Sequence, residues 1–283
     1  MVIINAHVHL IDLPSVLAQT GPDFIDYLKQ IPAFADVERV LPTLSEEALL
    51  RQMDEAGIER SILFALYCPI LKASNEFVRD ACRRHPDRFW GYASVDPHDE
   101  RAPEVLEQAI TGYGLKGLKL HPPLQGFYPN DRKLWPLYAK AQALGIPVVL
   151  HVGCTPFGHL VRLDQAQPLL LDEVAIAFPR LRIILPHLGT LWHQESFMLV
   201  EKHPNVYLDM AAYPYELREL VTPKIVERVG AHKWLFGTDF PMPYEGQTHR
   251  MADFVEVVNG LPLTDTVKQG MFSGNLQRLL DTA

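Results

Sequence analysis

The chain begins with the stretch MVIINAHVHL (residues 1–10), in which His7 and His9 follow an apolar run. The apolar run has the composition of a buried β-strand. Side chains two residues apart in a strand point to the same face, so the two imidazoles are predicted to lie side by side. Burying two adjacent imidazoles is costly unless a ligand uses both of them. This strand end is therefore the starting point of the functional analysis.

Short apolar runs of this kind recur along all 283 residues, and amphipathic stretches separate them. Alternating strands and helices predict parallel strand pairs joined by right-handed crossovers. The leading prediction is an α/β fold, a closed (β/α)8 TIM barrel in a single domain over residues 1–283. A doubly wound open sheet is the alternative, although no glycine-rich dinucleotide motif follows the first strand. The expected strands are residues 2–9, 59–66, 88–95, 117–121, 146–153, 182–189, 205–211 and 234–239.

The first long connection and the helix after it carry clear signals. Residues 10–44 are long and proline-rich for a loop, and in barrels such loops commonly form lids or pocket walls, which is the role expected here. Thr43, with Glu46 three residues later, predicts the start of a helix, and Gly57 predicts its end.

Composition limits the class of protein. The net charge of −8 argues against nucleic acid or an anionic membrane as the main partner. No apolar stretch approaches the roughly 20 residues that span a bilayer, and the N-terminus lacks the pattern of a secretory signal. Cys68, Cys82 and Cys154 are isolated, which suits a reducing compartment. We expect a cytoplasmic enzyme with a small-molecule substrate.

Titratable side chains gather at the ends of the expected strands. In a barrel all eight carboxyl ends meet at one rim, where active sites lie. Imidazole and carboxylate together suit zinc or another divalent first-row metal, with one position left open for water. The side chains in question are His7, His9, His121, His151, His187, Asp209 and Asp239.

The chain resembles the amidohydrolase superfamily, and in particular its amidohydrolase-related (family 2) branch of short TIM-barrel hydrolases and decarboxylases. The resemblance runs nearly end to end, and the lack of a β-sandwich before the first strand also matches this branch. The motifs that carry it are NAHVH (5–9), GLKLHPPLQGFYPND (117–131), LHVG (150–153), PHLG (186–189), LFGTDFP (235–241) and FSGNLQRLL (272–280).

The resemblance implies roles for individual residues. His7, His9, His151 and Asp239 would ligate one divalent ion, with zinc as the default and manganese, iron or cobalt as alternatives. Asp239 would also accept and deliver a proton, and His187 would orient or polarise the substrate. Many relatives form dimers, so self-association is expected.

Lys119 and His121 share one face of the fourth strand, which leaves several roles open. Lys119 would contact a substrate carboxylate, or be carbamylated and bridge two metals, or pair with a structural acid such as Asp209. The nearest branch generally uses one metal, so one is expected. His121 is a second candidate for substrate binding.

Three functions remain open at this stage. The first is hydrolysis of a small carboxylate-bearing lactone, ester or amide by a metal-activated water, with Asp239 as the proton shuttle. The second is non-oxidative decarboxylation of an aromatic or unsaturated acid on the same metal site. The third is a barrel that holds a metal without catalysis.

Overall fold

The computed structural model describes residues 1–21, 23–68, 70–241 and 250–281. Eight parallel strands form the centre of the molecule, as predicted, and a short antiparallel hairpin of β3 and β4 is added after the second of them. The strands are β1 (Ile4–His9), β2 (Arg60–Phe64), β3 (Leu66–Tyr67), β4 (Lys72–Ala73), β5 (Phe89–Tyr92), β6 (Leu118–Leu120), β7 (Val148–Leu150), β8 (Ile183–Leu185), β9 (Val206–Asp209) and β10 (Trp234–Leu235).

Backbone hydrogen bonds close these strands into a barrel. The ladders give the orders β1-β2-β5 and β10-β9-β8-β7-β6. Lys119 N–H donates to Ala93 O across the gap between β5 and β6, and His9 N–H donates to Phe240 O across the gap between β10 and β1. A closed ring of eight strands confirms the TIM barrel and is not compatible with an open sheet.

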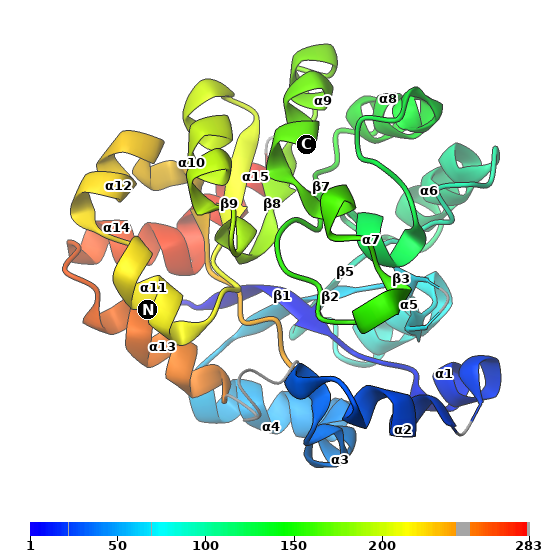
Figure 1. Ribbon diagram of the computed structural model, residues 1–283. Coiled ribbons are helices and arrows are strands. Elements are labelled where there is room, and N and C mark those ends of the chain that lie inside the picture. The colour runs from blue at the N-terminus through cyan, green and yellow to red at the C-terminus, as the bar shows by residue number, and fades with distance from the viewer. Residues whose placement is uncertain (22, 69, 242–249, 282–283) are drawn as a thin grey trace.

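Helices surround the strands (Figure 1). The helices are α1 (Leu13–Thr20), α2 (Asp23–Lys29), α3 (Val37–Val40), α4 (Glu46–Ala56), α5 (Asn75–Arg84), α6 (Ala102–Thr111), α7 (Pro122–Gln125), α8 (Trp135–Ala143), α9 (Leu171–Ala177), α10 (His193–Lys202), α11 (Pro214–Leu220), α12 (Pro223–Val229), α13 (Met251–Gly260), α14 (Asp265–Gln269) and α15 (Asn275–Asp281). Short 3-10 or π turns lie at Pro32–Phe34, Leu41–Leu44, Arg132–Leu134, Gly158–Leu160, Leu163–Ala166, Pro168–Leu170, Pro186–Gly189, Ala231–Lys233 and Gly270–Gly274. No helix in the described ranges has the length and apolar character needed to cross a membrane.

The start of α4 differs from the prediction. The cap is Ser45, whose side chain accepts from Ala48 N–H, and the helix begins at Glu46. Thr43 instead lies in a 3-10 turn that leads into the helix, and its hydroxyl donates to Val40 O. Gly57 ends the helix in the left-handed conformation, as predicted.

An irregularity in β1 brings its histidines into the barrel interior. Ile4 and Ala6 pack inside the barrel, whereas Val8 packs on its outer side against the surrounding helices. The register of β1 against β2 shifts between Asn5 and Val8. A bulge of this kind re-aims the side chains that follow it. In a regular strand, Ala6 and His7 would point to opposite faces. Because of the bulge, Ala6, His7 and His9 all face the barrel interior.

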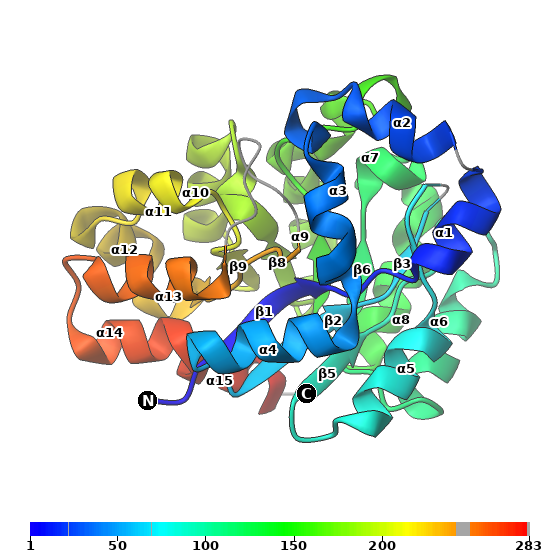
Figure 2. The ribbon, with the colours of Figure 1, turned by 90° about the horizontal axis from the view of Figure 1, so that it is seen from below.

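The described residues of the segment 10–44 form three short helices and two 3-10 turns. Figure 2 shows α2, α3 and α7 at the end of the molecule opposite to both chain termini. Tyr27 donates its hydroxyl hydrogen to Phe157 O at 3.0 Å, and the rings of Phe34 and Phe157 have their centroids 4.9 Å apart. These contacts join the segment to the loop after β7.

Candidate metal centre

Three potential ligand atoms converge at the carboxyl end of the barrel. The Nε2 atoms of His7 and His9 lie 3.2 Å apart. Asp239, in the loop after β10, places Oδ1 3.1 Å from His7 Nε2 and 3.2 Å from His9 Nε2. Ligands about 2.1 Å from one cation lie roughly 3.0–3.4 Å from one another. The spacing and the donor types therefore fit a single divalent metal ion.

A second carboxylate orients the first ligand. Asp209 Oδ2 lies 2.5 Å from His7 Nδ1, and Asp209 Oδ1 accepts from Ala211 N–H at 2.9 Å. A proton on Nδ1 leaves the lone pair of His7 Nε2 directed at the site, which is the usual arrangement behind a metal-binding histidine. A Cβ at Gly237 would collide with Asp209 Oδ1, which explains the glycine in the LFGTDFP motif.

The protonation states suit a cation. Burial lowers the pKa of His9 to about 4, so its imidazole is neutral and able to ligate at neutral pH. Burial alone would also lower the pKa of His7, but the Asp209 and Asp239 carboxylates outweigh it and the pKa is raised. Burial would raise the pKa of Asp239, yet the His187 and His7 imidazoles hold it well below its usual range. The pocket between the two carboxylates thus stabilises positive charge.

His187 and Asp239 both adopt backbone conformations that are unfavourable for residues with a side chain. Their φ values are 60° and 53°. Non-glycine residues in this region cost about 1–3 kcal/mol and cluster at functional sites. His187 Nδ1 donates to Ala211 O at 2.7 Å, and this bond fixes the orientation of the ring. The same Nδ1 atom lies 3.9 Å from Asp239 Oδ2. Burial lowers the pKa of His187 to about 4, so this imidazole is neutral as well.

His151 and His121 lie beside this cluster. The rings of His121 and His151 stack with their centroids 3.8 Å apart. His151 Nδ1 lies 3.2 Å from His187 Nε2, and His151 Nε2 lies 2.8 Å from Thr155 Oγ1. Unlike His7, His9 and Asp239, His151 is not part of the converging ligand group.

Lys119 is fully buried, and its Nζ has no hydrogen-bond partner among the described residues. The ammonium lies 4.8 Å from the centroid of the Phe64 ring. Burial lowers its pKa to about 8 against the attraction of Asp239 and Asp209. Asp209, one of the partners proposed for Lys119 from sequence, makes its close contact with His7 instead.

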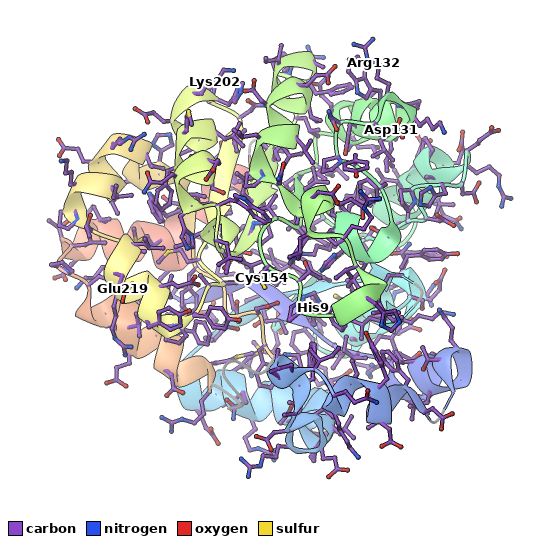
Figure 3. All side chains as sticks on the ribbon, viewed as in Figure 1. His9, Asp131, Arg132, Cys154, Lys202 and Glu219 are labelled. Carbon is purple, nitrogen blue, oxygen red and sulfur yellow. The ribbon has the colours of Figure 1, made fainter. Side chains whose placement is uncertain are left out.

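A cavity of about 140 Å³ opens beside the cluster. His9, His121, His151, His187 and Asp239 line its polar end. Figure 3 labels His9 and Cys154 near the middle of the molecule, and both line this cavity. Most of the remaining wall is apolar and comes from residues 11–44 and from the loops after β2, β6 and β7.

Comparison with known proteins gives the family. The amidohydrolase family model matches residues 4–282. The chain belongs to the amidohydrolase family. This confirms the resemblance drawn from the strand-end motifs, and it makes the protein an enzyme of that family.

One curated relative is the gamma-resorcylate decarboxylase of Polaromonas sp. (strain JS666), which is 25% identical over 83% of this chain and 86% of the relative. An uncharacterised TIM-barrel protein from Bordetella bronchiseptica superimposes with a TM-score of 0.77, 24% identity and coverage of 100% and 99% of the two chains. A dihydroxybenzoic acid decarboxylase from Polaromonas, solved with manganese and 2-nitroresorcinol, gives a TM-score of 0.71 at 19% identity, covering 99% and 97%.

The sequence interpretation of this amidohydrolase included Asp209 among the strand-end side chains but did not predict its contact with His7, and it missed Thr155. Asp209 lies at the end of the expected seventh strand, and that position was the only signal for it. Thr155 follows the LHVG motif by two residues and carries no pattern that would mark it. His249, which the sequence suggested as a structural or surface residue, lies outside the described residues.

Proposed function

We propose that this protein is a metal-dependent, non-oxidative decarboxylase of an aromatic or unsaturated acid. The observation that carries the proposal is the convergence of His7, His9 and Asp239 at one end of a cavity, in a chain related to a gamma-resorcylate decarboxylase. That relative favours decarboxylation over the hydrolysis of a lactone, ester or amide, which was the leading sequence prediction.

His7, His9 and Asp239 would hold the metal, and His151, on the wall of the same cavity, is available as a fourth ligand. When bound, a divalent ion would supply a positive charge that binds and orients the carboxylate of the substrate. Manganese is the proposed ion in place of zinc, because a related decarboxylase structure contains it and a histidine–carboxylate set accepts it.

The reaction breaks the bond between the substrate carbon and its carboxylate. Carbon dioxide leaves, the electron pair stays on the carbon, and a proton joins that carbon, so that one proton and no water is consumed. Asp239 and His187 are the groups at the polar end of the cavity that can pass this proton. The bond from His187 Nδ1 to Ala211 O supports that role by fixing the ring, and His121, which lines the same cavity, would contact the substrate.

The test is turnover of 2,6-dihydroxybenzoate by manganese-loaded enzyme in D₂O. We expect carbon dioxide release, and one deuterium at the ring carbon that carried the carboxylate. Enzyme stripped by a chelator should be inactive and should recover when manganese is restored. Rapid hydrolysis of a lactone or ester panel, with no carbon dioxide from aromatic or unsaturated acids, would overturn the proposal.

A further inference from the structure

The cavity beside the metal centre is lined mostly by apolar side chains, and its only charged or imidazole groups among the described residues are those of the metal-centre end, which limits what can fill it. We infer that the substrate is a monocarboxylic acid whose remaining body is uncharged and largely apolar, held by the side chains of residues 11–44. The inference rests on the proposed function for the position of the reacting carboxylate. It adds the substrate class.

The wall formed by residues 11–44 is apolar throughout the part that lines the cavity. Apart from Ile11, which precedes α1, the side chains come from α1, α2, α3 and the 3-10 turns between and after them, so apolar residues line the cavity along the whole segment. The lining residues of this wall are Ile11, Leu13, Val16, Phe24, Ile25, Leu28, Phe34, Val37, Val40, Leu41 and Leu44. Leu66, Leu71, Leu124 and Phe157 continue it from the barrel loops.

None of the charged residues described in this segment lines the cavity. Asp23, Asp26, Glu38 and Arg39 are exposed. Lys29 pairs with Glu38 at 2.7 Å on the outer surface. The segment is therefore amphipathic, with its apolar face turned to the substrate space.

A second charged group on the substrate would find no opposite charge beyond the polar end. Among the described residues that line the cavity there is no lysine or arginine. The residues outside the described ranges (22, 69, 242–249, 282–283) include neither type in the sequence. A carboxylate moved from water against this wall would lose hydration without a partner.

The volume sets the size of the apolar body. An apolar cavity of about 150 Å³ lined by Leu, Ile and Phe is known to hold benzene. The cavity of about 140 Å³ therefore fits one ring or a short branched chain next to the reacting carboxylate.

The experiment measures binding, not turnover, by calorimetry on manganese-loaded enzyme. The probes are 4-methylbenzoate, 4-ethylbenzoate and terephthalate, which are similar in size and differ in the group opposite the carboxylate. We expect terephthalate to bind at least tenfold more weakly than 4-methylbenzoate. The added methylene of 4-ethylbenzoate should tighten binding by up to about fourfold. Terephthalate binding as tightly as 4-methylbenzoate would overturn the inference.

A charge placed in the wall should reverse this preference. Ile25 is half-buried in the lining, so Ile25→Lys adds a cation with little effect on the fold, and Leu13→Lys is a second such position. Either variant should shift the affinity ratio toward terephthalate by tenfold or more. Ile176→Lys is the matched control, because Ile176 is 61% exposed on α9 and does not line the cavity. An unchanged ratio in both wall variants would contradict the inference.

The inference and the proposed function fail in different ways. Tight binding of the alkylbenzoates without carbon dioxide release from any acid would remove the decarboxylase proposal and leave the description of the wall intact. Carbon dioxide release from 2,6-dihydroxybenzoate, together with terephthalate binding as tightly as 4-methylbenzoate, would remove the apolar-substrate inference and leave decarboxylation in place.

Discussion

The two ends of the one cavity are built in different ways. At the polar end, His7, His9 and Asp239 come from opposite ends of the chain, and the hydrogen-bonded barrel fixes their positions. At the apolar end, one continuous segment, residues 11–44, supplies much of the wall and is joined to the loop after β7 by contacts of Tyr27 and Phe34 with Phe157. The difference suggests that the barrel fixes the chemistry, whereas the segment sets which substrate enters.

The largest effect should come from removing the carboxylate at the polar end. Asp239→Asn deletes both a charged ligand and a proton carrier, so carbon dioxide release should fall by about 10³-fold or more. Metal content, measured by plasma emission after dialysis, should fall as well. Asp164→Asn, on an exposed turn, is the control and should keep both. An active, metal-loaded Asp239→Asn enzyme would show that the polar end does not carry the chemistry.

The next largest effect should be a loss of local stability that is confined to the apolar end of the cavity. Phe34 is 4% exposed and packs on Phe157, and removing a buried phenylalanine ring costs about 3–5 kcal/mol. If the segment opens as a unit, amide exchange over residues 13–44 in Phe34→Ala should accelerate by roughly 10²–10³-fold. Manganese affinity should stay within twofold of the unsubstituted enzyme. Equal loosening of the barrel strands would mean that the two ends are one cooperative unit.

A smaller loss of metal affinity is expected from a substitution one contact away from the metal. Asp209→Asn keeps the shape of the side chain that orients His7 but removes its charge, and such changes weaken metal binding by about 10–100-fold. Competition with a fluorescent chelator measures this affinity. Asp172→Asn is the matched control, since it breaks a similar contact of 2.6 Å with His203 far from the centre. Equal losses in the two variants would contradict a specific role for Asp209.

The smallest effect per residue is a pH dependence of the stability of the metal-free protein. Burial lowers the pKa of His9, His187, His121 and His151 from the ordinary value of 6.5. Between pH 6.5 and 4 the unfolded chain binds protons that the folded chain does not, so folding stability must fall as the pH falls. Each imidazole should contribute a loss of about 1.4 kcal/mol at pH 5.5. His7, whose pKa is raised, opposes this.

Urea unfolding at pH 7.5 and pH 5.5 measures the change. His121→Gln removes one of the titrating imidazoles. The loss of unfolding free energy between the two pH values should therefore be smaller by about 1.4 kcal/mol in this variant. A stability that is the same at both pH values would show that these imidazoles are not buried in neutral form.

The sequence predicted the barrel because its evidence is local. Apolar runs, turn residues and the strand-end motifs each lie within a few residues of one another. The helices of residues 10–44 were expected only as a loop, since they are four to eight residues long and interrupted by prolines. The shift of the helix cap from Thr43 to Ser45 has a similar cause, because a 3-10 turn occupies the place where the cap was expected.

The site was predicted in composition but not in detail. The pairing of His7 with His9 follows from strand periodicity. The link between His7 and Asp209 spans 202 residues and depends on the order of strands around the ring. The positive φ angles of His187 and Asp239 leave no mark in a single sequence, because neither residue type requires them. His151 was expected as a ligand, and its role as a fourth ligand stays a proposal.

The central claim is that His7, His9 and Asp239 hold one metal ion, and an anomalous-diffraction structure of the manganese-loaded enzyme tests it most directly. The account predicts a single manganese peak at about 2.0–2.3 Å from His7 Nε2, His9 Nε2 and an Asp239 oxygen. A peak that leaves these three atoms unliganded, or two peaks bridged by a carbamylated Lys119, would contradict it.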